Sequence, residues 1–482
     1  MTTTVADVVA DGLARAGTTR VFAVAGDRDS EPLVEAVERR GLPVVRVERA
    51  DVACVMAGVS GALSGAPGAV VIGGDVGGVA GGLAYASFNR APAIVISAGA
   101  PVNTYGSESV TKAELAVASA SAAHWIAHAC QLAMKEPWGP VRLEVPPATA
   151  AASTLPVATS CRPAPLPPPD PSALDAAVRL LEASERTLVV AGRWCRSEAD
   201  AVWIRAFAEA RPAPVLATPN ARGVMPDPHP LLIGILDDGE PERALLASAD
   251  LIVAIGVDPG EAPRSAWPSR TRVLELTPVA PESTSDDRVA VIGEIGPILE
   301  ELAPRLRNRR SAEWDVARLH ALKQAAWTPP TAPRELAAYR VVETARRLTP
   351  AGTVAVFEHG DVWRHAARAW HAVVPGECLI STGPSTEGFA LVVATAAQLT
   401  RHEARVLCFT EPRAIRRAPA HLATVAALCV PVLIVVVGDD LSSFTPPPNL
   451  RSFVATSIAD FAGAFETALG AGAPAILSVA VA

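Results

Sequence analysis

The strongest constraint on the fold of this chain is a repeated alternation of short apolar runs with Ala/Leu-rich segments suited to helices. The stretch from Arg405 to Asp440 is one example, because apolar runs at 406–409 and 430–437 flank helix-like sequence. Short apolar runs bounded by turn residues are typical of buried strands. Strand–helix–strand units of this kind build parallel sheets that helices cover on both faces. We therefore predict an α/β fold with doubly wound parallel sheets.

The alternation occurs in three blocks that Pro-rich sequence separates. At 482 residues the chain is too long for one ordinary core. The first break, near 150–171, contains PAPLPPPDP and is typical of an extended linker, and the second, near 305–333, is charged and then Pro-rich. We predict three α/β domains, at residues 1–150, 170–305 and 335–482.

The composition and the termini exclude several classes of function. A net charge of −8 gives no electrostatic footprint for nucleic acid. No apolar run reaches membrane-spanning length, and the N-terminal MTTTVADVVADGLARAG lacks the basic region of a signal peptide. The seven cysteines are scattered without a CxxC pair, and the nine histidines lack metal-ligand spacing. We expect a cytoplasmic, bacterial protein with buried free thiols and no metal ligands, one that contacts neither nucleic acid nor membrane.

Motifs in all three blocks have counterparts in one known family. The first block holds VVRVERADVACVMAGVSGALSG, in which Glu48 ends a strand before a small-residue helix, and it closes with GPVRLEVP. The central block holds PVLATPNARGVMPDPHPLLIG and ADLIVAIGVD, and the third holds STGPSTEGFALVVATAAQL. Together these stretches resemble the thiamine-diphosphate (ThDP) enzymes of the acetolactate synthase type over nearly the whole chain. The resemblance implies a pyrimidine-binding, a central and a diphosphate-binding domain, in that order.

The resemblance gives Glu48 a catalytic role. It implies that Glu48 hydrogen-bonds the aminopyrimidine ring of the cofactor and drives formation of the reactive ylide, although Val47 stands where the family usually has histidine. From the residues alone, Glu48 is better explained as a strand-end glutamate paired with Arg46 or Arg49; the resemblance brings the two interpretations level. The Gly-rich turn that follows the next strand is weak support for a dinucleotide site, and nothing in the sequence indicates FAD.

The third block departs from the family at the cofactor. Gly388 fits the family's glycine turn, but Glu387 stands where an apolar residue props the cofactor. The family's GDG…NN diphosphate motif, laid on this chain without a gap, falls on 411–413 and 438–439. Pro412 offers neither a side-chain oxygen nor an N–H, so a magnesium ligand is lost.

Several charged residues lie in the same region, and some of them have two interpretations. Glu411 adds negative charge near a diphosphate. Arg413 could fork onto phosphate oxygens or simply be a solvated helix start. Glu358 and His359 face the substrate side in the family, or are exposed loop charges. After Asp439 the family's covering loop is missing. We expect ThDP with Mg²⁺ not to bind in the usual manner.

Three functions remain open. We favour an acetolactate synthase-like lyase or C–C transferase that acts on a 2-oxo acid or related small carboxylate, with altered or lost use of ThDP. The alternatives are a cofactor-independent enzyme on the same scaffold and a non-catalytic subunit that supplies Glu48 to a competent homologue. The predicted catalytic residues are Glu48, Glu387 and His359, and the predicted cofactor contacts are Glu48, Gly388, Arg413 and Asp439.

We also predict an oligomer. The helices after Glu48 and after Gly74 are rich in Gly, Ala and apolar residues and have too little polar surface to be solvated. We expect a homodimer or tetramer that buries them, possibly completed by a homologous subunit.

Overall fold

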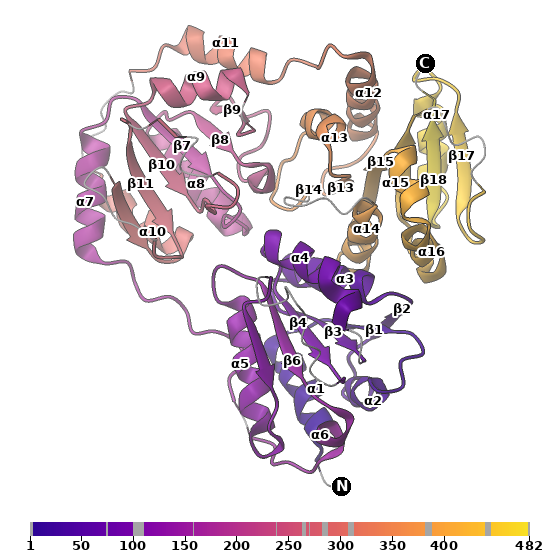
Figure 1. Ribbon diagram of the computed structural model, residues 1–482. Coiled ribbons are helices and arrows are strands. Elements are labelled where there is room, and N and C mark those ends of the chain that lie inside the picture. Colours follow the sequence, from indigo (N-terminus) through magenta and orange to yellow (C-terminus); the bar gives the residue numbers. More distant parts are fainter. Residues whose placement is uncertain are drawn as a thin grey trace. The chain divides into compact units, whose positions relative to one another are not determined.

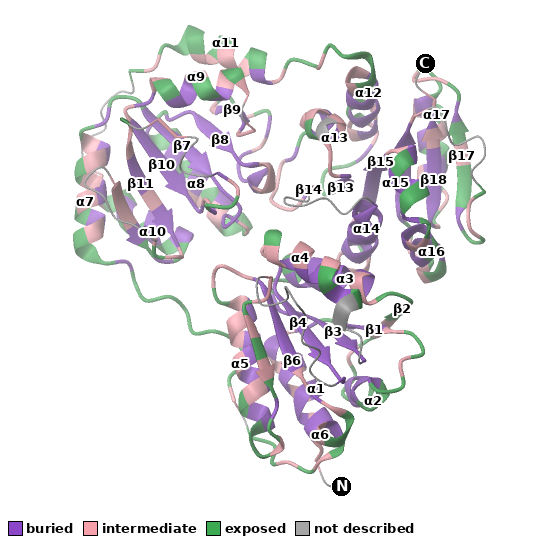
Figure 2. Ribbon diagram, viewed as in Figure 1, coloured by how far each residue is buried: buried purple, intermediate pink, exposed green. Residues whose placement is uncertain are grey.

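The chain forms three six-stranded parallel sheets with helices on their faces (Figure 1). The computed structural model describes residues 3–73, 76–99, 110–157, 159–237, 239–262, 267–268, 270–281, 288–306, 313–380, 388–438 and 445–480, with only the backbone of Val76, Gly77 and Asp361. The predicted fold class is confirmed. Half of the strands, mostly those in the middle of the sheets, are buried along their whole length, as expected where helices cover both faces (Figure 2).

The first sheet has the strand order β2-β1-β3-β4-β6-β5. Its strands are β1 (Val21–Val24), β2 (Val44–Val47), β3 (Gly68–Ile72), β4 (Ala93–Ser97), β5 (Ala113–Ala116) and β6 (Pro140–Glu144). Its helices are α1 (Val5–Ala16), α2 (Glu31–Arg39), α3 (Ala50–Ser64), α4 (Ala80–Phe88), α5 (Ala122–Met134) and α6 (Pro147–Ala151). Helix α1 begins at a capping box, in which Thr4 and Asp7 each bond the other's backbone N–H, and ends at Gly17 in the left-handed conformation.

The second sheet has the order β12-β11-β10-β7-β8-β9. Its strands are β7 (Thr187–Ala191), β8 (Val215–Ala217), β9 (Leu232–Ile235), β10 (Leu251–Ile255), β11 (Arg272–Thr277) and β12 (Arg288–Ile292). Its helices are α7 (Pro171–Glu182), α8 (Glu198–Ala210), α9 (Glu240–Ser248), α10 (Ile295–Leu302) and α11 (Val316–Ala326). This is the order of dinucleotide-binding sheets, and the chain reverses direction across the sheet between β7 and β10.

The third sheet has the order β14-β13-β15-β16-β18-β17, which repeats the topology of the first sheet. Its strands are β13 (Val354–Phe357), β14 (Cys378–Ile380), β15 (Val406–Thr410), β16 (Leu433–Val437), β17 (Arg451–Ala455) and β18 (Ala475–Val479). Its helices are α12 (Pro333–Arg347), α13 (Asp361–Ala366), α14 (Phe389–Thr400), α15 (Pro412–Arg417), α16 (Pro419–Leu428) and α17 (Phe461–Leu469). The reversal here lies between β13 and β15.

The chain divides into two compact units. Unit 1 comprises Met1–Ala164, Val356–Gly360 and Ser381–Ala482, and unit 2 comprises Pro165–Ala355 and Asp361–Ile380. Within unit 1, α3 packs against α4, α14 and β3, and every residue from Val52 to Gly61 is buried. A Cβ at Gly68 would overlap the backbone of Ala57, so this close approach of α3 to β3 requires glycine.

The burial of α3 changes the basis of the predicted oligomer. The apolar surface of α3 is covered within its own unit, by α14 above all. Helix α4 keeps some apolar exposure, since 47% of Phe88 is accessible. The oligomeric state stays a prediction that now depends on α4 rather than on α3.

The structure differs from the sequence-based expectation in three places. The second break is not a featureless linker, because it contains α11. The Ala-rich sequence FVATSIADFAGAFETALG predicts a single closing helix, but FVA ends β17, and α17 begins only at Phe461. Strand β5 alternates between partly buried and exposed residues, and without a continuous apolar run it gave no strand signal.

All seven cysteines are free; six are buried as predicted, and Cys429 is exposed. No helix among the described residues is long and apolar enough to cross a membrane.

Candidate functional site

The carboxyl ends of β13 and β15 meet at the reversal point of the third sheet, where open α/β sheets bind ligands. Glu358 directly follows β13, and Thr410 is the last residue of β15. The Thr410 hydroxyl donates to Oε2 of Glu358 at 3.0 Å, and the backbone N–H of Gly388 donates to Oε1 at 3.1 Å. Glu358 is 5% exposed and Thr410 is 0% exposed. A buried carboxylate thus joins the two strands and the turn before α14.

Gly388 holds the turn that precedes α14. It is the N-cap of this helix and has φ +85°, which side chains other than glycine rarely adopt. A Cβ at this position would also overlap the Cβ of Ala418. The sequence prediction of a glycine turn here is consistent with this geometry.

His421 fixes the other side of the same turn. Its Nδ1 lies 3.2 Å from the carbonyl oxygen of Gly388 and donates to it. His421 is 6% exposed, and burial lowers its pKa, while the hydrogen bond to Gly388 works in the opposite direction. The carboxylate of Asp51 also favours the protonated form, and Arg49 opposes it, so the start of α3 lies close to this histidine.

Aromatic contacts also link the first and third domains within unit 1. The ring of Phe389 lies 5.3 Å from that of His421 and makes an edge contact with Tyr85 of α4 at 6.1 Å. The start of α14 is therefore held between α4 and α16.

Glu48 follows β2 and its side chain is exposed. The two arginines proposed as structural partners are otherwise engaged: Arg46 pairs with Glu38 at 2.7 Å, and Arg49 pairs with Asp51 at 2.6 Å. Within the described part of the chain, Glu48 has no hydrogen bond or ion pair. The structural explanation of Glu48 as half of a local ion pair is therefore not supported.

The remaining predicted site residues are only partly brought together. Glu387 and Asp439 lie outside the described residues, as does most of the segment where we expected a shortened covering loop. His359 is partly exposed beside Glu358, and Arg413 is exposed on α15. Thr410 and His421 were not predicted, because their position at the site depends on the strand order.

Two observations on the described residues bear on the expected loss of a metal-bridged diphosphate. Pro412 is buried at the first position of α15, and a Cβ at Gly438 would lie 2.9 Å from its Cγ and Cδ atoms. The proline ring thus fills the space between the turns after β15 and β16. Among the described residues, no group of three or more His, Cys, Asp or Glu side chains could hold a metal ion.

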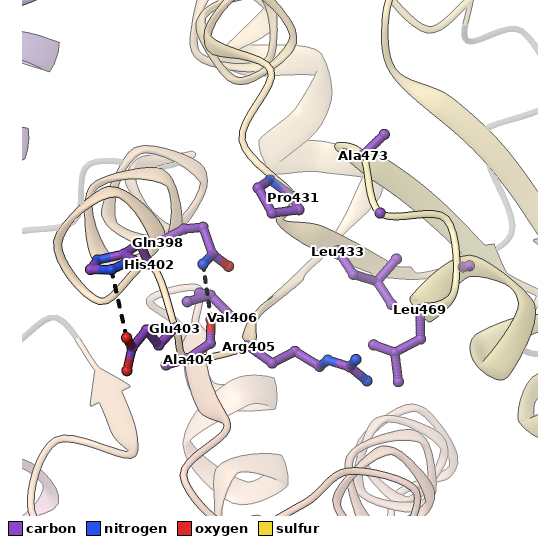
Figure 3. A pocket seen from close by; sticks show the side chains of 12 residues that line it. Gln398, His402, Glu403, Ala404, Arg405, Val406, Pro431, Leu433, Leu469 and Ala473 are labelled. Carbon is purple, nitrogen blue, oxygen red and sulfur yellow. Dashed lines mark hydrogen bonds and ion pairs between the residues drawn. The ribbon is translucent and has the colours of Figure 1, made fainter.

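A separate pocket of about 190 Å³ opens at the opposite edge of the third sheet (Figure 3). It lies at the amino ends of β15 and β16, between Gln398 of α14 and Leu469 of α17. It therefore contributes nothing to the site around Glu358.

Comparison with known families gives two matches. Residues 174–302 match the model described as thiamine pyrophosphate enzyme, central domain. Residues 3–122 match the model described as thiamine pyrophosphate enzyme, N-terminal TPP binding domain. These ranges contain the first two sheets almost completely.

Several curated proteins are similar to this chain. The acetolactate synthase large subunit of Parasynechococcus marenigrum is 27% identical over 291 residues, which is 56% of this chain and 46% of the relative. The acetolactate synthase isozyme 1 large subunit of Escherichia coli is 23% identical over 49% of this chain and 43% of the relative. A probable 2-ketoarginine decarboxylase of Pseudomonas aeruginosa is 26% identical over 48% of this chain and 42% of the relative. The alignments span less than half of each relative's own length.

Proposed function

The chain belongs to the thiamine pyrophosphate enzyme family and is acetolactate synthase-like, and on that premise we propose that it acts on C–C bonds of 2-oxo acids or related small carboxylates without a metal-bridged diphosphate. The observation that carries this proposal is the contrast between two glutamates. Glu48 is exposed and has no partner among the described residues, whereas Glu358 is buried and bonded. The first domain thus keeps a carboxylate free to act on a ligand.

Glu48 suits a role in proton transfer. An exposed carboxylate at a strand end can accept a proton from a bound group within hydrogen-bond reach. Since Arg46 and Arg49 are engaged elsewhere, neither of these two guanidiniums neutralises this carboxylate. His359 and Glu387 remain proposed catalytic residues of the third domain.

Features of the third domain support the proposed loss of metal-bridged diphosphate binding. Glu358 uses the Gly388 N–H at the start of α14, a position where a backbone donor and the helix dipole would otherwise favour a bound anion. Pro412 fills the neighbouring turn. A diphosphate brought to this edge of the sheet would meet the carboxylates of Glu358 and Glu411 and would lack a metal to offset them.

The contrast between the exposed Glu48 and the buried Glu358 also favours one alternative. In this alternative the chain is a subunit that supplies Glu48 to a site shared with a competent homologue. Both matched family models lie in the first two domains, and the changes described above lie in the third. A chain of this kind would contribute its first domain and would not catalyse the reaction alone.

The test is to titrate the purified protein with ThDP by calorimetry, with and without Mg²⁺, and to assay 2-oxo acids such as pyruvate. Turnover by the protein alone that Mg²⁺ does not stimulate supports the proposal. Turnover only after mixing with an intact acetolactate synthase, and its loss in Glu48→Gln, supports the shared-site alternative. Inactivity in both arrangements across the 2-oxo acid panel would refute both.

A further inference from the structure

A second buried carboxylate lies at the reversal point of the central sheet. Glu261 follows β10, and its side chain is 1% exposed. Its Oε2 accepts from the backbone N–H of Arg193 at 2.9 Å and from the Thr218 hydroxyl at 3.1 Å. Its Oε1 accepts from the Asn220 amide at 2.7 Å and lies 3.3 Å from Nε of Arg193.

These four groups form a donor set suited to an anion. A backbone N–H, a hydroxyl and a side-chain amide donate hydrogen bonds, the guanidinium makes an ion pair, and both carboxylate oxygens are used. The donors come from the loops after β7 and β8, whereas Glu261 reaches them from the loop after β10, across the reversal. Open α/β sheets receive external ligands at such a reversal of strand order, and the guanidinium of Arg193 adds a favourable charge for an anion.

We infer that Glu261 is an internal ligand that occupies an anion-binding site in the central domain and excludes small external carboxylates from it. The inference concerns the central domain and is independent of the function proposed above. It explains why a carboxylate with this many donors is buried in a crevice rather than exposed on a loop.

Backbone contacts limit what could replace the carboxylate. The N–H of Trp194 donates to the carbonyl of Gly256 at 2.9 Å, so the loop after β7 is bonded directly to the end of β10. A Cβ at Gly192 would overlap the backbone of Val257. The loops after β7 and β10 therefore touch beside Glu261, which favours a small anion over a large one.

The alternative is that Arg193 and Glu261 are an ordinary buried ion pair with no preference for a particular anion. Truncation would then destabilise the protein, because it leaves a buried arginine without its partner. It would not create a site that recognises the size of an added carboxylate. Chemical rescue separates the two explanations.

The test uses Glu261→Ala, which removes Cγ, Cδ and both oxygens, the same four heavy atoms that acetate contains. We expect the thermal midpoint of the full-length variant to fall by at least about 5 °C. Acetate should restore about half of that loss, relative to chloride at equal ionic strength and to the wild type. Glu261→Gly removes one carbon more and should respond best to propionate. Adenosine monophosphate, which is much larger, should restore neither variant.

Two further variants serve as controls. Glu301→Ala removes a carboxylate of the same domain that is 57% exposed, and acetate should affect it as it affects the wild type. Glu261→Gln keeps the volume filled and should not respond to acetate. If Glu261→Ala folds only when acetate is present, the inference is supported. Equal effects of acetate and chloride, or variants that stay unfolded with every anion, overturn it.

Discussion

Thr410 donates a 3.0 Å hydrogen bond to Glu358, and the two residues end strands on opposite sides of the point where the third sheet reverses its strand order. The bond ties together the two strand ends that would otherwise border a ligand crevice. Because the same carboxylate accepts the N–H of Gly388, one side chain sets the geometry of two strands and the start of α14.

Replacing Glu358 should therefore destabilise the protein strongly. Glu358→Ala leaves the buried Thr410 hydroxyl and the Gly388 N–H without this acceptor, and we expect a loss of about 2–4 kcal/mol in the free energy of unfolding. Glu358→Gln keeps one oxygen acceptor and should cost about 1–2 kcal/mol. Urea unfolding of the two variants measures the difference. Equal losses in the free energy of unfolding would mean that the two carboxylate oxygens of Glu358 do not stabilise the fold through these hydrogen bonds.

Gly388→Ala should cost more than an alanine at another glycine of positive φ. Both the backbone conformation and the overlap with Ala418 oppose a Cβ, and we expect a loss above about 3 kcal/mol. Gly472 is the matched control, because it has φ +63° but no atom within 4 Å of an added Cβ. Gly472→Ala should cost about 1 kcal/mol. Thermal unfolding that ranks the two variants equally would contradict the packing argument.

His421 should make stability depend on pH below neutrality. Its pKa is lowered by burial from the ordinary 6.5, so the unfolded chain binds a proton at a pH where the folded chain does not. The stability it contributes is fully present above about pH 6.5 and is lost as the pH falls toward the lowered value. Burial lowers the pKa of His371 as well, so two histidines contribute.

The measurement is the free energy of unfolding between about pH 7 and pH 5. His421→Gln should flatten part of the decline and leave the part due to His371. His402→Gln is the control, since the side chain of His402 is 80% exposed. A decline that His421→Gln leaves unchanged would show that this histidine does not titrate as described.

The fold was predictable from the sequence because parallel strands that are buried on both faces consist of continuous apolar residues. The run at 406–409, which lies in β15, is an example. Strand β17 was missed for the opposite reason: it lies at the edge of its sheet and begins Arg451-Ser452, both exposed. Gly388 could be found from a local motif. His421 could not, because only the folded chain brings α16 against a turn that lies 33 residues earlier.

The last prediction concerns the cofactor. We expect ThDP to bind no more tightly with Mg²⁺ than without it, because Pro412 replaces a metal ligand and its ring lies against Gly438. Losing a metal ligand and placing carboxylates beside a diphosphate should cost several kcal/mol, or about a hundredfold or more in affinity. Exposed arginines of α15, Arg413 and Arg416, can bind phosphate oxygens without a metal, so any residual binding should weaken with salt and in Arg413→Ala. Calorimetry with ThDP at two salt concentrations, with and without Mg²⁺, decides the matter. Micromolar or tighter binding of ThDP that requires Mg²⁺ would refute the prediction. If Glu48→Gln then abolished this binding, the result would favour the usual mechanism of the family.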